Sequence, residues 1–334
     1  MDILIKSFNR PYYLDRCIQS IYENVSDKAV PITILDDGTP DKYLKKIQLK
    51  FPEVKIIKSE FYDEKSSFIQ RNQALENTKI PINLWMNAAK NASKYFLLLE
   101  DDIWFTREID LQKKQKTLMN ENIFLVKLIW LNNPKLIHGK TKKTQDNIIV
   151  YEPKVFTKNP ILHRLIFGIT RFGNRKLMRF LNLFSDDKAL DYYSIYGVAG
   201  AIFRKDYFLS LWYNSVNEVD ENLQLINAVK FWHKNKNINF ARTNQEFLAT
   251  GFLSSATNKH FNNKDFDLFQ FNRVINEAWF SDKFDAMDNF PKDLNNLAIA
   301  EILTNENHPN AQVDDWNQWV FKFKKQFQSF GCNI

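Results

Sequence analysis

The chain has few cysteines and few glycines for its length of 334 residues. Its two cysteines, Cys17 and Cys332, exclude a disulfide framework and favour a reducing compartment. The eight glycines form neither a Gly-x-Gly-x-x-Gly motif nor a Gly-x-x-x-x-Gly-Lys-Ser/Thr motif. A dinucleotide-binding fold of the usual kind and a P-loop kinase are therefore both disfavoured.

Long apolar runs are also lacking. No uninterrupted apolar stretch reaches about 18 residues, so no membrane-spanning helix is expected. Residues 1–6 have neither the basic start nor the apolar length of a signal peptide. We therefore expect a cytoplasmic protein that is soluble or peripheral at the inner face of the membrane. The net charge of +7 is scattered and no recognition motif accompanies it, so nucleic-acid binding is not expected.

The most informative feature is an apolar run that ends in three acids. Residues 95–99 are apolar without a helical period, which indicates a strand buried on both faces. Glu100, Asp101 and Asp102 follow directly, and three adjacent carboxylates repel one another unless a cation lies among them. Oxygen ligands of this kind suit Mg²⁺ or Mn²⁺. The alternative is a turn with solvated acids, because Asp is a common turn residue.

The first sixty residues repeat this architecture. Short apolar strands are predicted at residues 3–5, 32–35 and 54–57, with helical periodicity between them and Pro11 at a first helical turn. This alternation predicts a parallel sheet, whose strands all end along one edge. Asp36 and Asp37 end the second strand. We therefore expect them to converge with the acids at 100–102.

Four segments together resemble a known family. Residues 7–10 (Ser-Phe-Asn-Arg), 35–38 (Leu-Asp-Asp-Gly), 67–74 (with Arg71 and Asn72) and 100–102 (Glu-Asp-Asp) follow one another at suitable spacing. In this order they resemble the donor half of GT-A glycosyltransferases, most like the family 2 group of nucleotide-sugar transferases. Residues 67–74 resemble a segment of that family in which the Arg-Asn pair stands at the start of a helix. The resemblance covers roughly the first hundred residues, and it implies an α/β fold with a mostly parallel, Rossmann-like sheet flanked by helices.

The resemblance also implies roles for individual residues. Asp36 or Asp37 is expected to hold the nucleoside, Glu100 or Asp101 the ribose, and Asp102 a Mn²⁺ or Mg²⁺ ion that bridges to the diphosphate. Further contacts to the nucleotide are expected from Ser7, Asn9, Arg10 and Arg71. A late loop histidine can complete such a metal site, which makes His260 a candidate ligand. An exposed loop histidine without a role is the alternative.

The second half should supply the acceptor site. Residues 192–204 combine a strand-like run with two glycines and resemble the floor beneath donor and acceptor. A helix is expected to follow, up to about Lys234, and Asp220 or Glu221 at its start resembles the acid that serves as general base, with Glu218 behind them. The alternative is electrostatic, because acids are favoured in the first turn of any helix.

Two basic amphipathic segments look like additions to the core. They are residues 160–184 and the helix around residues 316–330, and each could bury its apolar stripe or lie on an anionic membrane. We expect a GT-A domain at residues 1–262, divided into a nucleotide-binding half (1–105) and an acceptor half (106–262). A helical extension is expected at residues 263–334. Residues 140–146 are polar and are predicted to form a loop.

The sequence thus predicts a metal-dependent glycosyltransferase. It would move a sugar from a nucleoside-diphosphate sugar, UDP-sugar being favoured, to a hydroxyl of a glycan or lipid-linked glycan. The resemblance to family 2 favours inversion at the anomeric carbon, but a retaining GT-A enzyme has the same donor half. A sugar nucleotidyltransferase is one alternative, but residues 7–10 lack the glycine-rich loop of such enzymes. A non-catalytic module that binds a glycan or a membrane is the other alternative, and it would be expected to lose Asp102.

Overall fold

The structure is a computed structural model that describes residues 1–73, 79–168, 174–235, 237–256 and 266–334. The chain divides into two compact units, both built from separate stretches of sequence. Unit 1 comprises Met1–Leu4, Lys79–Leu98 and Asp110–Glu246, and unit 2 comprises Ile5–Thr78, Leu99–Ile109 and Phe247–Ile334. The predicted boundary at residue 262 lies outside the described residues.

Unit 2 contains the alternating strands and helices that were predicted for the first sixty residues. Strands β3, β2, β1 and β4 are neighbours in this order, and β2 pairs with β3 in parallel. A two-stranded sheet joins β5 to β11. The elements are the end of β1 (Asp2–Ser7, which belongs to unit 1 up to Leu4), α1 (Pro11–Asn24), β2 (Ile32–Asp36), α2 (Asp41–Lys50), β3 (Lys55–Lys58), α3 (Tyr62–Gln70), the end of β4 (Tyr95–Glu100), β5 (Ile103–Phe105), β11 (Leu248–Thr250), α11 (Leu268–Phe280), α12 (Asn296–Glu306) and α13 (Val313–Ser329).

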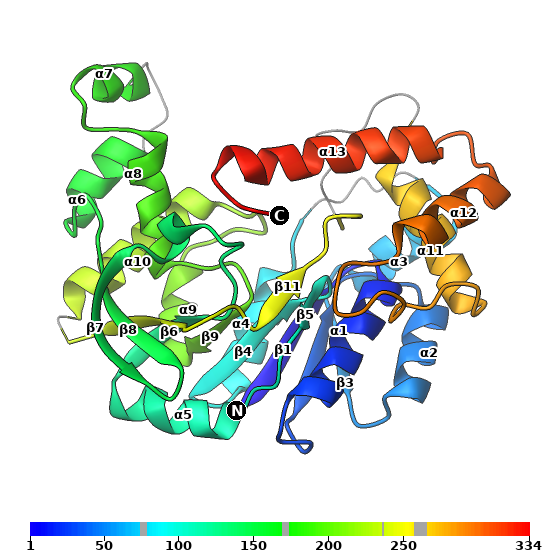
Figure 1. Cartoon of the computed structure of the whole chain (residues 1–334), viewed down its shortest axis with the longest axis horizontal. Helices are drawn as coiled ribbons and strands as arrows, with labels where there is room; N and C mark the ends of the chain where they lie inside the picture. Colours follow the sequence, from blue (N-terminus) through cyan, green and yellow to red (C-terminus); the bar gives the residue numbers. More distant parts are fainter. Residues whose placement is uncertain (74–78, 169–173, 236, 257–265) are drawn as a thin grey trace. The chain divides into compact units, whose positions relative to one another are not determined.

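Helix α1 anchors the C-terminal segments of unit 2 (Figure 1). It begins at Pro11, as predicted, and almost its whole first half is buried. The Tyr12 hydroxyl donates a 2.8 Å hydrogen bond to Asn272 of α11, and the Tyr13 hydroxyl donates one of 2.9 Å to Asp293. Arg16 is fully buried and donates to the carbonyl of Ala286 at 2.6 Å. The C-terminal segments are therefore part of the core around α1.

Helix α13 buries its apolar stripe within unit 2. Trp316 and Trp319 are each about 2% exposed or less, and the Trp316 ring lies parallel to that of Phe271 at 5.8 Å. The Trp316 indole N–H also donates a 2.9 Å hydrogen bond to the carbonyl of Leu253. Of the two possibilities for the C-terminal amphipathic helix, burial against the protein is the one observed.

Unit 1 carries the other strands of the protein. From β4 the strand order is β4-β9-β6-β10-β8-β7; β9 is antiparallel to both neighbours, whereas β10 is parallel to β6. Its elements are α4 (Ile82–Asn91), β4 up to Leu98, α5 (Leu111–Asn120), β6 (Ile123–Lys127), β7 (Gly139–Gln145), β8 (Ile148–Pro153), α6 (Pro160–His163), a π-helical turn (Arg164–Gly168), α7 (Asn174–Phe180), α8 (Asp186–Leu190), β9 (Ala201–Arg204), α9 (Lys205–Leu211), α10 (Glu221–Lys234) and β10 (Asn239–Thr243), with 3-10 helices at Pro134–Ile137 and Asp191–Ile195.

The predicted fold class is confirmed. The protein is of the α/β class, with strands flanked by helices and a helical C-terminal segment, and β4 forms where the apolar run of residues 95–99 predicted a buried strand. None of the described helices is both long and apolar enough to cross a bilayer.

Two local predictions in unit 1 are wrong. Residues 140–146 were expected to be a loop, but they form most of β7, which pairs with β8 through a turn at Asp146 and Asn147. Both turn residues have positive φ, of 51° and 61°, as a tight hairpin turn requires. Because β7 lies at the edge of its sheet, a strand of lysines and threonines is tolerated there. Its polar sequence led to the prediction of a loop.

The strand predicted at residues 192–204 is also shorter than expected. Only Ala201–Arg204 form β9, while Asp191–Ile195 form a 3-10 helix. Tyrosine hydroxyls occupy the carbonyls there: Tyr151 donates to Ser194 O at 2.6 Å and Tyr207 donates to Ile195 O. These carbonyls are therefore engaged by side chains rather than by a neighbouring strand.

His163 at the end of α6 is a buried histidine among aromatic rings. Its side chain lies beside Phe167 and edge-on to Tyr192, and the residue is 2% exposed. Neither ring nitrogen has a hydrogen-bond partner among the described residues. Burial lowers the pKa of His163 from 6.5 to about 4, because the charged ring would lose its hydration.

We predict that His163→Phe removes part of the acid sensitivity of the fold. Below pH 6.5 the unfolded chain binds a proton at this position that the folded protein refuses until about pH 4. The wild type should therefore lose up to about 3 kcal/mol more stability than the variant between pH 7 and pH 4. Chemical denaturation at a series of pH values measures this difference. Parallel pH profiles for the two proteins would contradict the assignment.

Candidate functional site

The predicted acid turn of unit 2 is joined to the first loop by backbone hydrogen bonds. The amide of Asp101 donates to Lys6 O at 2.9 Å, so β1 and β4 are still paired where they end. Beyond that pair, the amide of Phe8 donates to the Asp101 carboxylate at 3.2 Å. Lys6 and Glu100 form an ion pair of 2.6 Å. The first and the last of the four predicted motifs are thus brought together.

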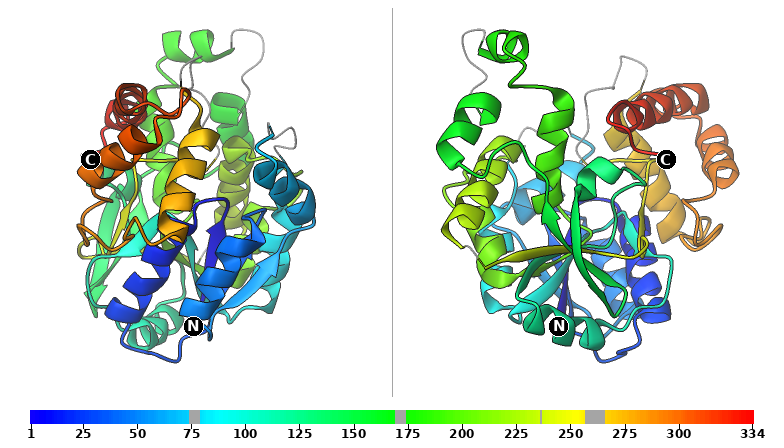
Figure 2. Two further views of the ribbon diagram at one scale, coloured as in Figure 1. Left: turned by 90° about the vertical axis from the view of Figure 1, so that its right-hand side faces the viewer. Right: turned by 60° about the vertical axis from the view of Figure 1, so that its left-hand side comes forward.

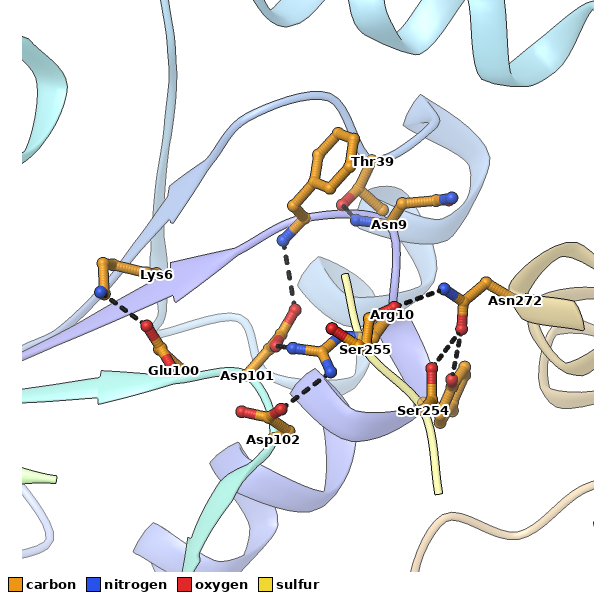
Figure 3. Close-up of polar contacts among 12 residues, drawn as sticks. Lys6, Asn9, Arg10, Thr39, Glu100, Asp101, Asp102, Ser254, Ser255 and Asn272 are labelled. Atoms are coloured by element: carbon orange, nitrogen blue, oxygen red, sulfur yellow. Dashed lines mark hydrogen bonds and ion pairs between the residues drawn. The ribbon is translucent and has the colours of Figure 1, made fainter. Parts of the chain in front are cut away.

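Arg10 lies between the two aspartates (Figure 3). Its Nη1 donates to Asp102 Oδ2 at 2.8 Å, and its Nη2 donates to Asp101 Oδ1. Burial raises the pKa of both carboxyl groups, while the Arg10 charge opposes that rise. Burial also works against the charge of Arg10, yet the two carboxylates raise its pKa well above the ordinary value. The guanidinium is therefore charged and shared between two acids.

Asp102 retains one unpaired oxygen. Its Oδ1 is buried and has no hydrogen-bond partner among the described residues. Its backbone carbonyl accepts from the amide of Gly251 at 2.8 Å, and a Cβ at Gly251 would overlap the Tyr13 ring. The turn is thus held closely from two sides while Oδ1 stays without a donor.

The predicted nucleoside residues, Asp36 and Asp37, have different environments. Asp36 is fully buried, and its oxygens accept from the amides of Gly38 and Thr39 and from the Thr39 hydroxyl, at 3.0, 2.8 and 2.6 Å. Burial raises the pKa of Asp36 to about 6 in spite of these hydrogen bonds. The three groups that donate these hydrogen bonds belong to the loop after β2, so Asp36 shapes that turn.

Asp37 carries an ion pair instead. Its Oδ2 accepts from Lys65 Nζ at 2.5 Å, and its Oδ1 accepts from the Ser59 hydroxyl at 2.6 Å. Burial raises the pKa of Asp37, and the contacts with Lys65 and Ser59 lower it again. Lys65 lies on α3 and is itself buried, so the turn after β2 is tied to α3.

Asn9 shapes the loop between β1 and α1. Its φ of 52° is left-handed, a conformation that asparagine tolerates better than most residues. The backbone amide of Asn9 donates to the Thr39 hydroxyl at 2.9 Å. The side-chain amide of Asn276 donates through Nδ2 to Asn9 O and Oδ1 at 3.1 Å each. Ser7 Oγ, at the end of β1, is buried without a partner among the described residues.

The sequence analysis missed two asparagines of α11 at this site. Asn272 accepts from the Tyr12 hydroxyl at 2.8 Å and the Ser254 hydroxyl at 2.5 Å, and it donates to Ser255 O at 3.0 Å (Figure 3). Asn276 lies four residues on, also buried, and contacts Asn9. Two asparagines at i and i+4 in the apolar stripe of a helix were the signal that could have identified them.

The motif of residues 67–74 predicted that Arg71 stands at the start of a helix, but it does not. It follows the last residue of α3 and is exposed, and its Nε donates to Ser67 O at 3.3 Å. Asn72 has a φ of 55°, which is typical of the residue that ends a helix. The prediction of a helix start is therefore wrong. The described structure gives Arg71 no contact to the acid cluster of Asp101 and Asp102.

The predicted base candidates lie in unit 1. Asp220 caps α10, because its carboxylate accepts from the amide of Leu223 at 2.9 Å. Glu221 accepts a 2.5 Å hydrogen bond from the Tyr193 hydroxyl, whereas Glu218 is exposed. The predicted helix is confirmed, since α10 ends at Lys234. His260, the predicted additional metal ligand, lies outside the described residues.

Solved structures with a similar arrangement include glycosyltransferases. The match to S. aureus TarS covers 93% of this chain and 44% of the TarS chain, with 12% sequence identity and a TM-score of 0.41. The match to TarS 1-349 in complex with UDP-GlcNAc covers 91% of this chain and 72% of that chain, with 12% identity and a TM-score of 0.41. The match to the galactosyltransferase LgtC, in complex with donor and acceptor sugar analogs, covers 72% of this chain and 73% of that chain, with 10% identity and a TM-score of 0.36.

The chain thus spans less than half the length of full-length TarS. No model of a protein family matches the sequence, and no curated protein is similar enough to count as a relative. Glycosyltransferases are among the solved structures to which this chain is similar. At these low scores the likeness assigns no activity by itself.

We predict that Arg10→Leu strongly destabilises the protein. Without Arg10, two buried carboxylates would face each other with no counter-charge, and breaking a buried ion pair in this way typically costs about 3–5 kcal/mol. Adding Asp101→Asn to this variant should restore part of the loss, because one of the two charges is then removed. The exposed Arg71→Leu is the control and should cost less than about 0.5 kcal/mol. Equal unfolding midpoints for Arg10→Leu and the wild type would contradict this account.

Proposed function

We propose that the protein is a glycosyltransferase that uses a nucleoside-diphosphate sugar, with a UDP-sugar favoured. The proposal rests on the acid cluster of unit 2, and above all on the free Oδ1 of Asp102. The motifs of residues 7–10, 35–38 and 100–102 resemble the donor site of GT-A enzymes, and in this structure they form adjoining loops. The acceptor we propose is a hydroxyl of a glycan or lipid-linked glycan.

The charge balance of the cluster favours a cation. Lys6 pairs with Glu100, and Arg10 is divided between Asp101 and Asp102, so three carboxylates face two positive charges. When all three carboxylates are ionised, one negative charge is in excess, and burial makes that charge costly, which is why the pKa values of Asp101 and Asp102 are raised. Arg10 already engages one oxygen of each aspartate, which leaves Asp102 Oδ1 as the oxygen best able to take an external ligand.

The residues present fit a divalent cation of the Mg²⁺ type. Among the described residues no group of three or more His, Cys, Asp or Glu side chains is arranged as a complete metal site. Mg²⁺ and Mn²⁺ do not need one, because they are commonly held by one or two carboxylates together with waters and substrate phosphates. Asp102 would hold the ion through Oδ1. A bound ion of this kind would neutralise charge on the departing diphosphate.

For the nucleoside we favour Asp37 over Asp36. The Asp36 carboxylate is used up by three hydrogen bonds within its own loop, and the residue is fully buried. Asp37 is 7% exposed and is held by two side chains, Lys65 and Ser59, that can change partners when a ligand binds. Asp36 would then act as a positioning residue, because it fixes the loop that carries Asp37.

The general base is proposed among the acids at the start of α10, with inversion at the anomeric carbon. An acceptor hydroxyl must lose its proton as it attacks, and a carboxylate can accept it. One oxygen of Asp220 caps the helix, and one oxygen of Glu221 accepts from Tyr193. Each carboxylate is therefore oriented by a contact that leaves its second oxygen for a substrate. We choose Asp220 first and Glu221 second.

We predict that Asp102→Asn abolishes metal-dependent binding of the nucleotide sugar. The amide retains the shape of the side chain but removes the charge that would hold the ion. Titration calorimetry with UDP-sugars, with and without Mn²⁺, measures the loss. Asp63→Asn, an exposed substitution on α3, is the matched control and should bind as the wild type does. Unchanged Mn²⁺-dependent binding by Asp102→Asn would refute the metal assignment.

We predict further that replacing the true base lowers turnover by about 10²–10⁴-fold. Asp220→Asn retains a residue that caps helices well, and Glu221→Gln retains a partner for Tyr193, so each variant removes charge with little change in structure. Glu218→Gln tests the third candidate, which is exposed. Donor affinity should stay nearly constant in all three variants. Near-normal transfer by all of them would show that the base lies elsewhere or that configuration is retained.

A further inference from the structure

Residues 153–185 of unit 1 carry an unusual charge distribution. The segment contains seven lysines and arginines and no aspartate or glutamate. The formal net charge of the whole chain is +7, so the remaining residues are balanced between acids and bases. Although basic side chains occur throughout the chain, this one stretch of about thirty residues has the same net charge as the whole protein.

The same stretch exposes large apolar side chains. Leu177 and Phe180 of α7 and Leu181, which directly follows α7, recur at i, i+3 and i+4. The amide of Leu181 donates to Leu177 O at 2.9 Å, so the three side chains share one face, and Phe180 is 87% exposed. On α6 and the π-helical turn, Ile161 and Leu165 are also exposed, with Ile161 at 71%. We call the exposed apolar side chains the α6–α7 patch: Ile161, Leu162, Leu165, Leu177, Phe180 and Leu181.

The two parts of the patch are close to each other. Helix α7 contacts the π-helical turn that follows α6. Figures 1 and 2 show α7 at the end of unit 1, beyond α8 and away from strands β6 to β10. Arg164 and Lys176 are exposed within these segments, and no carboxylate among the described residues pairs with either. Two other basic residues of the stretch form exposed ion pairs: Lys158 with Glu152 at 2.9 Å, and Arg179 with Asp186 at 3.0 Å.

We propose that the α6–α7 patch docks on an anionic lipid bilayer. Exposed leucines and a phenylalanine can enter the boundary between headgroups and acyl chains, while arginine and lysine remain at the phosphates. Both features are needed, because an apolar patch alone does not select anionic lipids and basic side chains alone bind weakly. The proposal goes beyond the proposed enzymatic function, since it requires neither donor nor acceptor.

Two other occupants fit the patch less well. In a twofold dimer the same patch would meet itself, so the concentrated positive charge of one copy would face that of the other. A nucleic acid would use the basic side chains, but exposed leucines contribute nothing to phosphate contacts. The combination of exposed aliphatic side chains with the exposed basic side chains of Arg164 and Lys176 is what favours a bilayer.

Co-sedimentation of the full chain with lipid vesicles tests the proposal. Vesicles of phosphatidylcholine alone are compared with vesicles that contain about one third phosphatidylglycerol, at low and high salt. We expect binding only to the anionic vesicles, and weaker binding as salt rises. No binding to the anionic vesicles, or equal binding to both kinds, would overturn the proposal.

Substitutions then assign the binding to the patch. Phe180→Ser with Leu177→Ser, and separately Arg164→Gln with Lys176→Gln, should each weaken binding by about tenfold or more. The controls are Leu49→Ser, at a site 85% exposed in unit 2, and Lys322→Gln with Lys325→Gln on the rival basic helix α13. Thermal unfolding checks that every variant is folded.

The outcomes are distinct. Loss of binding in both patch variants and in neither control supports the proposal. Unchanged binding in the patch variants, or loss only in the α13 variant, overturns it. A dimer in light scattering that Phe180→Ser dissociates would assign the patch to a second copy instead. Binding to RNA that depends on Arg164 and Lys176 but not on Phe180 would assign it to nucleic acid.

Discussion

The Arg10 guanidinium, held between two buried carboxylates, is the contact on which the candidate site depends. It joins the start of α1 to the turn after β4, two segments more than ninety residues apart in the chain. Two aspartates at this depth would otherwise repel each other, and their burial would drive them to take up protons. The Arg10 charge opposes this rise in their pKa values, and one oxygen of Asp102 is left for a ligand.

The same contact links the site to the rest of unit 2. Arg10 immediately precedes α1, whose buried face contacts α11 and the segment around Asp293 through Tyr12 and Tyr13. Asn276 of α11 in turn contacts Asn9, the neighbour of Arg10. The C-terminal helices thus support the loop that carries the donor motif, although they are far from it in sequence. A substitution that loosens α11 should therefore alter the site as well as the stability.

The positions of the acids followed from the sequence, but their partners did not. Alternating strands and helices predicted that β1, β2 and β4 would end near one another, and local periodicity was enough for this. The division of Arg10 between Asp101 and Asp102, and the use of Asp36 by its own loop, depend on side-chain geometry that no pattern in the sequence describes. Asn272 and Asn276 were missed because they contact the site across more than 250 residues.

The errors in secondary structure have a common cause. Strand β7 was missed because an edge strand need not be apolar. Residues 191–195 form a 3-10 helix in which the carbonyls of Ser194 and Ile195 accept hydrogen bonds from tyrosine hydroxyls. Arg71 ends a helix that its motif suggested it would begin. In each case a tertiary contact or a place in the sheet decided the local structure, and neither is visible in a short stretch of sequence.

The most direct test of the donor site is a crystal structure grown with UDP and Mn²⁺, with anomalous scattering used to locate the manganese. The account predicts an anomalous peak within about 2.2 Å of Asp102 Oδ1, bridged to the diphosphate, with the nucleoside beside Asp37. A peak elsewhere, or a nucleotide bound away from the loops after β1, β2 and β4, would contradict the central claim.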